Sequence, residues 1–144
     1  KQIRDAGITV PWVSDDGAND PKLVASAGAA AAEGALMTCP CGDITANPAA
    51  KSFVTDYTAA AGGAPGTYSA EAFDATNFLL AAIDAGKTTA KDINDYVSTQ
   101  SFEGLAKTLK FDSKGEVAAT TIYVYEVKGG KVVFDGSVDK LVGG

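Results

Sequence analysis

Histidine is missing from all 144 residues of this sequence. Histidine is the usual general base near neutral pH and the commonest metal ligand. Its absence removes the Ser-His and Cys-His pairs that activate catalytic nucleophiles. We therefore expect no catalytic residue, no bound metal and no cofactor.

Cysteine is scarce, with only Cys39 and Cys41, which flank Pro40. Residues two apart are poorly placed to bridge each other without strain. We expect free thiols, or a bridge from one of them to a cysteine outside this segment. A zinc site would need further ligands that the sequence lacks. The cysteines alone leave the redox compartment open.

Basic blocks and long apolar runs are also absent. The net charge of −6 without a basic cluster argues against nucleic acid as a partner. No apolar run reaches the length of a membrane span. The hydrophobic content of 46% instead predicts a folded globular chain. It opens on KQIRDAG, which resembles the last turn of a helix ending at Gly7, so we expect a piece of a longer protein.

The stretch ITVPWVSDDGANDP is the most informative part of the chain. Its β-branched and aromatic residues predict a strand over Ile8–Val13, and Asp20-Pro21 predicts a helix start. Asp15, Asp16 and Asn19 then lie between the carboxyl end of a strand and a helix, where open α/β sheets bind ligands. The alternative is that they serve only as turn and cap residues, as these types commonly do.

The following residues predict an α/β organisation. A helix over Lys22–Glu33, with Gly28 favouring an end near Ala27, leads to a strand at Ala35–Thr38. Strand, helix and strand in this order form a βαβ unit with parallel pairing.

Further elements follow a loop with no periodicity. The helix over Ser69–Ala85 is apolar over so wide a surface that we expect it to be largely buried. A Gly-Gly pair at 129–130 predicts a type I′ hairpin turn. The other predicted elements are helices over Asn47–Ala61 and Thr89–Gln100 and strands over Leu105–Phe111, Val117–Val127 and Lys131–Phe134.

Four blocks occur in order with short spacers: GITVPWVSDDGANDP, AAEGALMTCPC, GAPGTYSAEAFDA and SFEGLAKTLKFDSKGEVAATTIYVYEV. Together they resemble the C-terminal part of branched-chain amino-acid binding proteins, the extracytoplasmic receptors of ABC importers. The resemblance implies an α/β chain that forms part of a two-lobed type I periplasmic-binding-protein fold. It assigns residues 1–38 to the C-terminal lobe, 39–47 to a hinge or crossover, 48–118 to the N-terminal lobe and 119–144 to strands returning to the C-terminal lobe.

The resemblance also implies a binding site. Asp16 takes the position of the acidic residue that binds the α-ammonium of the ligand. Tyr68 matches an aromatic residue that packs on the aliphatic side chain of the ligand. Asp15, Gly17 and Asn19 are expected to shape the loop. The groups that hold the α-carboxylate lie in a part of the family fold absent here, so we expect an incomplete site.

The function that the resemblance implies is capture of an aliphatic amino acid for a membrane permease. It places the protein in the periplasm or outside the cell, held by a lipid anchor or by the permease. The missing half or a second copy of the chain is an expected partner. The same fold also serves as the sensor domain of receptors and regulators.

An enzyme that uses Asp15 and Asp16 as an acid–base pair or a Mg²⁺ site is a third alternative. Adjacent loop residues seldom aim both carboxylates at one atom, and no phosphate-binding loop accompanies them. We therefore expect a binding protein that is not an enzyme.

Overall fold

The structure is a computed structural model that describes residues 1–118 and 121–143. The chain forms two compact units. Unit 1 contains Lys1–Gly42 and Thr121–Gly144, and unit 2 contains Asp43–Thr120. The assignment of the ranges to the two lobes of a receptor stays a prediction.

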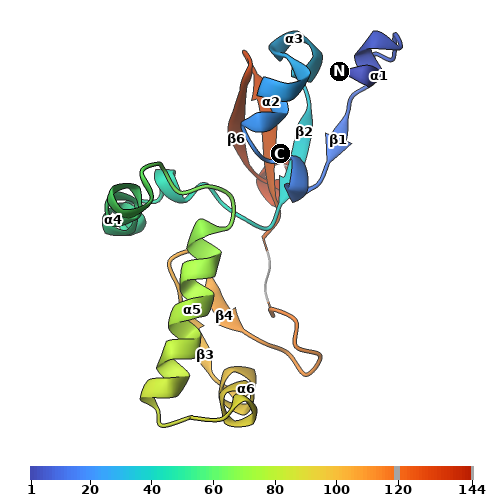
Figure 1. Ribbon diagram of the computed structural model, residues 1–144. Coiled ribbons are helices and arrows are strands. Elements are labelled where there is room, and N and C mark those ends of the chain that lie inside the picture. The colour runs from blue at the N-terminus through green and yellow to red at the C-terminus, as the bar shows by residue number, and fades with distance from the viewer. Residues whose placement is uncertain (119–120, 144) are drawn as a thin grey trace. The chain divides into compact units, whose positions relative to one another are not determined.

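Unit 1 is built on a four-stranded sheet of order β1-β2-β5-β6 (Figure 1). β1 pairs with β2 in parallel, with Val13 opposite Leu36, which confirms the predicted parallel pairing of the βαβ unit. The two other pairings of the sheet are antiparallel. The strands are β1 (Val13–Ser14), β2 (Leu36–Cys39), β5 (Tyr123–Lys128) and β6 (Lys131–Ser137).

The helices of unit 1 pack on the sheet through small apolar residues. The buried cluster consists of Ala32, Ala35, Met37 and Val127, with Leu23 among the partly buried residues against it. As predicted, the first crossover helix ends at Ala27, because Gly28 has φ of 84° and separates it from the next helix. The helices are α1 (Gln2–Asp5), η1 (Asp16–Ala18), α2 (Lys22–Ala27), α3 (Ala29–Ala32) and α7 (Val138–Val142).

The predicted strand at the start of the crossover is wrong in its bounds, whereas the predicted helix start is confirmed. The segment predicted as a strand over Ile8–Val13 pairs with a neighbouring strand only at Val13–Ser14, and the carbonyls of Ile8 and Val10 accept hydrogen bonds from the Arg4 guanidinium at 2.8 and 2.9 Å. α2 begins at Lys22, as predicted, with Pro21 at the N-cap position in place of Asp20, and an Asp20 carboxylate oxygen accepts from the Lys22 backbone N–H at 2.7 Å. The capping role of Asp20 is therefore retained.

The β5–β6 hairpin has the turn that its sequence predicts. Gly129 and Gly130 have φ of 57° and 72°, as a type I′ turn requires. The Glu33 carboxylate accepts from both of their backbone N–H groups, at 2.9 and 3.2 Å. The strand predicted over Val117–Val127 is shorter, since β5 starts at Tyr123. Val117 instead forms an isolated bridge with Phe111, and residues 119 and 120 of the prediction lie outside the described residues.

Unit 2 holds the three longest helices. Asn47 caps the first turn by accepting from the Ala49 N–H at 3.0 Å, as the Asn-Pro pair predicts. The strand predicted over Leu105–Phe111 covers only Thr108–Lys110, because the chain bends at residues 105 and 106. The sequence did not predict the preceding strand, Ser101–Glu103. The elements are η2 (Ile44–Ala46), η3 (Pro48–Ala50), α4 (Lys51–Ala61), α5 (Ser69–Asp84), α6 (Ala90–Thr99), β3 (Ser101–Glu103) and β4 (Thr108–Lys110).

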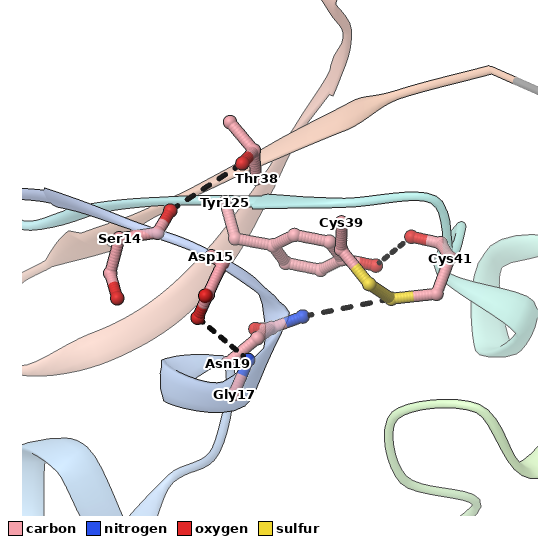
Figure 2. The surroundings of a disulfide bond; sticks show 8 residues. All are labelled: Ser14, Asp15, Gly17, Asn19, Thr38, Cys39, Cys41 and Tyr125. Atoms are coloured by element: carbon pink, nitrogen blue, oxygen red, sulfur yellow. Dashed lines mark hydrogen bonds between the residues drawn. A yellow bond between two sulfur atoms is a disulfide. The ribbon is translucent and has the colours of Figure 1, made fainter.

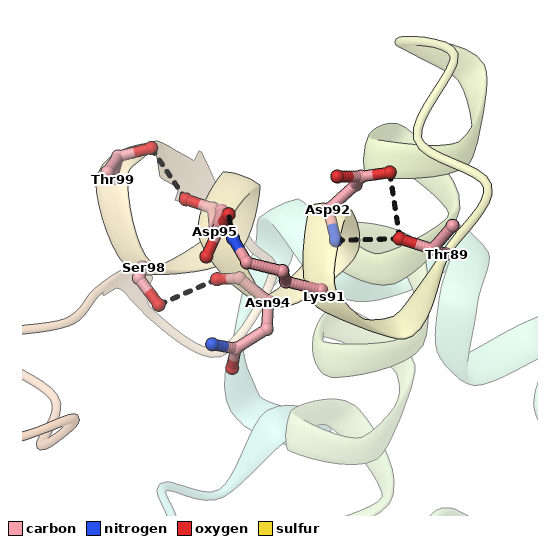
Figure 3. A network of polar contacts seen from close by, with 7 residues as sticks. All are labelled: Thr89, Lys91, Asp92, Asn94, Asp95, Ser98 and Thr99. Carbon is pink, nitrogen blue, oxygen red and sulfur yellow. Dashed lines mark hydrogen bonds and ion pairs between the residues drawn. The ribbon is translucent and has the colours of Figure 1, made fainter.

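α6 begins at the Thr89–Asp92 capping box that its sequence predicts, of which the bond from the Asp92 backbone N–H to the Thr89 side chain is formed (Figure 3). Thr89 Oγ1 accepts from the Asp92 backbone N–H at 3.1 Å and donates to the Asp92 carboxylate at 2.8 Å. Lys91 and Asp95 form an exposed ion pair one turn apart. These polar contacts join residues of α6 and its N-cap, so they account for where the helix begins.

α5 departs from its predicted burial. Ala70, Asp74, Phe78 and Ala82 are buried along one face of this helix. Phe73, Leu79, Leu80 and Ile83 are each between 45% and 50% exposed. The expectation of a largely buried helix is wrong, because these four apolar side chains stay about half exposed, although Phe73 packs on Phe53 of α4 with ring centroids 5.0 Å apart.

Asp74 links α5 to the β3–β4 turn. Its side chain is 1% exposed, and its two carboxylate oxygens accept from the backbone N–H groups of Leu105 and Ala106, both at 2.8 Å. A Cβ on Gly104 would overlap the Asp74 carboxylate and lie 2.7 Å from the Lys107 carbonyl oxygen. Only glycine therefore fits at position 104.

Burial raises the pKa of the nearby Glu71 carboxyl, against the opposing effects of a backbone hydrogen bond and the Lys107 charge.

Candidate functional site

The acidic loop of unit 1 follows the carboxyl end of β1. Because β1 and β2 are parallel, the carboxyl end of β2 lies at the same edge of the sheet. The Thr38 hydroxyl in β2 donates a hydrogen bond to the Ser14 carbonyl oxygen at 3.5 Å. This bond joins the two strands just before the loop. The loop is thus anchored to the sheet on its N-terminal side.

The loop itself is a single turn of 3-10 helix. Asp15 caps it by accepting from the Gly17 backbone N–H at 3.2 Å, and the Asn19 N–H donates to the Asp16 carbonyl oxygen at 3.0 Å. Asp15 is exposed, whereas Asp16 is half-buried. Asp15 therefore has the cap role that its residue type favours, and it holds the backbone of Gly17. The ligand-binding roles of these residues stay predictions.

A disulfide lies against the end of this loop (Figure 2). Cys39 and Cys41 are bonded to each other, so the expectation of free thiols or an outside partner is wrong. Their Cα atoms are 5.0 Å apart, within the range that a disulfide spans. The spacing argument failed because the chain turns at Pro40 directly after β2 and brings the two Cα atoms within reach.

Two polar side chains meet this disulfide segment. Asn19 is 8% exposed, and its Nδ2 donates to the Cys41 sulfur at 4.0 Å. The Tyr125 hydroxyl donates to the Cys41 carbonyl oxygen at 3.0 Å (Figure 2). Sequence reasoning missed Tyr125 and the disulfide as neighbours of the loop. The adjacency of parallel strands β1 and β2 was the available signal, since it places both of their following segments at one sheet edge.

Tyr68 belongs to unit 2 and precedes α5. It is half-buried and has φ of 64° and ψ of 6°, the left-handed conformation that non-glycine residues seldom adopt. Among the described residues it is the only non-glycine residue with positive φ. Such strain is often kept where a side chain must be presented to a ligand. The conformation therefore favours a functional role over that of an ordinary residue before a helix.

The structure brings four of the five predicted site residues together, in the loop Asp15–Asn19. Tyr68 lies in the other unit, and each unit is described by itself. Within residues 1–118 and 121–143, no group of three or more Cys, Asp or Glu side chains is arranged to hold a metal ion. Over the same part of the chain, no helix combines the length and the apolar character needed to cross a bilayer.

The family can be assigned from the comparison with family models. The model of the periplasmic binding protein family matches residues 1–131, which is most of the chain. The chain belongs to the periplasmic binding protein family. Its α/β structure is part of the type I periplasmic-binding-protein fold, as the resemblance implied. No curated protein matches the chain significantly.

Solved structures of this family are similar to the chain over nearly its whole length. A leucine-binding protein of Thermotoga maritima is 32% identical, with a TM-score of 0.78, over 94% of this chain and 39% of the relative. A branched-chain amino-acid transporter substrate-binding protein of Streptococcus pneumoniae, solved with isoleucine, is 27% identical, with a TM-score of 0.76, over 94% and 38%. An ABC-transporter solute-binding protein of R. palustris, solved with benzoate, shares the fold at 24% identity and a TM-score of 0.73, over 95% and 38%. The chain thus spans less than two fifths of the length of these relatives.

Proposed function

We propose that the chain takes part in binding an aliphatic, branched-chain amino acid for import by an ABC transporter. The observation that carries the proposal is the 32% identity to a leucine-binding protein over 94% of the chain. The acidic loop lies within residues 1–131, which the family model matches. A carboxylate at the end of a parallel strand is suited to the charged α-ammonium of an amino acid.

Each predicted site residue has a proposed role. Asp16 binds the ammonium group, while Asp15 and Asn19 shape the loop around it and Gly17 keeps its turn tight. Tyr68 packs on the aliphatic side chain of the ligand. The capping bond of Asp15 and the burial of Asn19 support shaping roles for these two residues.

The proposed setting is extracytoplasmic. A disulfide between Cys39 and Cys41 fits an oxidising compartment such as the periplasm. The proposed partners are the amino acid, the membrane permease, and either the remaining part of the receptor fold or a second copy of the chain. Attachment to the membrane through a lipid anchor or the permease is part of the same proposal, and no reaction is catalysed.

The first test is a thermal melt of the chain with millimolar leucine, isoleucine or valine. A ligand that binds the native state stabilises it, by about 2.7 kcal/mol at a concentration of about one hundred times Kd. We expect a clear rise in Tm with at least one of the three and none with glutamate. A cooperative melt that no amino acid shifts would contradict binding by this chain.

The Tyr68 assignment is tested by comparing Tyr68→Gly with Tyr68→Ala. The left-handed backbone disfavours alanine, so we expect the glycine variant to be more stable by about 1 kcal/mol in urea unfolding. At exposed Thr76, in the middle of α5, the matched pair should show the opposite order, because glycine weakens helices. Both Tyr68 variants should change the preference among leucine, isoleucine and valine. An equal loss of affinity for all three would make Tyr68 a structural residue.

A further inference from the structure

The disulfide lies where β2 ends, beside the loop that follows β1. Cys39 is the last residue of β2 and is 0% exposed, and Cys41 is 2% exposed. The bridge closes a ring of very few residues, so it restrains the unfolded chain far less than a long-range bridge would. Its main effect is therefore expected in the local structure around Cys41.

Cys41 is held by two neighbouring strands of the sheet. The disulfide bonds it to Cys39 in β2, and its carbonyl oxygen accepts from Tyr125 of the neighbouring strand β5 at 3.0 Å. Tyr125 pairs with Met37, which is fully buried in the core of unit 1. The Cys41 sulfur is thus a fixed point at the edge of the sheet.

The loop rests on this fixed point through Asn19. The backbone N–H of Asn19 closes the 3-10 turn on the Asp16 carbonyl oxygen, while its buried side chain donates to the Cys41 sulfur (Figure 2). Sulfur is a weak acceptor and the contact is 4.0 Å long, so the bond itself contributes little energy. Its effect is to orient the buried amide toward Cys41 at the C-terminal end of the turn.

We propose that the Cys39–Cys41 disulfide positions the ligand-binding loop Asp15–Asn19 through the side chain of Asn19. The proposal rests on the function proposed above, since that function assigns the loop to the ligand. If the loop is already ordered before the ligand binds, the free energy of binding is not reduced by the cost of ordering it. Without the bridge, the Cys41 sulfur no longer has a fixed place, and the loop is more often out of its binding conformation.

The test uses the double variant Cys39→Ala/Cys41→Ala and measures amide hydrogen exchange in the ligand-free chain. The backbone N–H groups of Gly17, Ala18 and Asn19 are all hydrogen-bonded within the loop, so each reports its opening. We expect their exchange to rise about tenfold, as for a local opening, while the Val127 N–H, bonded to Ala35 at 2.9 Å, keeps its protection. Leucine binding should weaken about tenfold if the ordered fraction of the loop falls to about a tenth.

Two further variants separate positioning from stability. Phe78→Ala removes buried volume from unit 2, outside the unit that contains the loop, and should lower stability without raising loop exchange. Asn19→Ala leaves the disulfide intact and should raise exchange at Gly17 and Ala18. It therefore tests whether the Asn19 side chain positions the loop even if the double variant does not fold.

The outcomes are distinct. Unchanged exchange at Gly17 and Ala18 in Asn19→Ala would overturn the proposal, as would unchanged leucine affinity in a double variant in which the ordered fraction of the loop has fallen to about a tenth. Raised exchange with weaker leucine binding supports it. If the variants raise loop exchange but the unaltered chain binds no amino acid, the positioning of the loop is supported and only the proposed function is overturned.

Discussion

Replacing Asp74 by alanine is expected to lower the free energy of unfolding of unit 2 by about 2–5 kcal/mol. The carboxylate is 1% exposed and accepts from the backbone N–H groups of Leu105 and Ala106. Its removal leaves two part-buried donors without this acceptor and leaves a cavity beside the turn. Asp74→Asn should cost less, because the amide oxygen can still accept one of the two bonds while its NH₂ group faces the other donor.

The measurement is urea unfolding followed by far-ultraviolet circular dichroism, which reports mainly on α4, α5 and α6 of unit 2. Asp84→Ala is the matched control, because Asp84 is exposed on the same helix and sits in its last turn, where a negative charge is unfavourable. The control should leave stability unchanged or slightly higher. Equal effects of Asp74→Ala and Asp84→Ala would show that the buried carboxylate does not hold the turn.

Gly104→Ala tests the same contact from the other side. The added Cβ would overlap the Asp74 carboxylate and lie 2.7 Å from a backbone carbonyl oxygen, so we expect a loss of about 2–3 kcal/mol. Gly63→Ala is its control, because a Cβ there meets nothing within 4 Å and the backbone is outside the left-handed region. A Gly104→Ala variant as stable as Gly63→Ala would contradict the close packing of α5 against the turn.

Features that depend on a few neighbouring residues could be predicted from the sequence. The Thr89 capping box, the Gly129-Gly130 turn and the Asn47 cap each require only residues within four positions of one another. The parallel direction of the β1–β2 pair also followed from the order of the elements. These local rules were enough to place most helices and the hairpin of unit 1.

Features that depend on distant residues could not be predicted. Asp74 was missed because its partners lie 31 and 32 positions away, although a carboxylate on an apolar helix face was a visible signal. The strand predicted over Ile8–Val13 was too long, because the length of a strand depends on pairing with its neighbour. Only Val13 and Ser14 pair with β2. The exposed face of α5 shows the same limit, since an apolar pattern predicts burial but not the presence of a partner.

The candidate site shows both cases. The position of the acidic loop at a sheet edge followed from the sequence, because it requires only a parallel strand pair. The disulfide beside the loop did not, because spacing alone does not give the path of the chain at Pro40. The strained backbone of Tyr68 was also invisible, since tyrosine does not by itself indicate a left-handed conformation.

Asp16→Ala is expected to weaken amino-acid binding by about 2–5 kcal/mol, since it removes the charge that the proposed site offers to the ligand ammonium. Asp16→Asn should cost much of the same free energy, because the side chain keeps its shape and loses its charge. Titration calorimetry with leucine measures both losses. A change of less than about tenfold, which is about 1.4 kcal/mol, in both variants would contradict the assignment.

The control for Asp16 is Glu33→Gln, which removes one negative charge at the opposite end of the same sheet. Glu33 precedes β2 and holds the Gly129-Gly130 turn, whereas the acidic loop lies where β1 and β2 end. If binding depends on the overall charge of unit 1, both substitutions should weaken it alike, and added salt should weaken binding to the unaltered chain. If the carboxylate of Asp16 contacts the ammonium directly, only its loss should matter, because a contact in a water-excluded site is screened much less than long-range attraction.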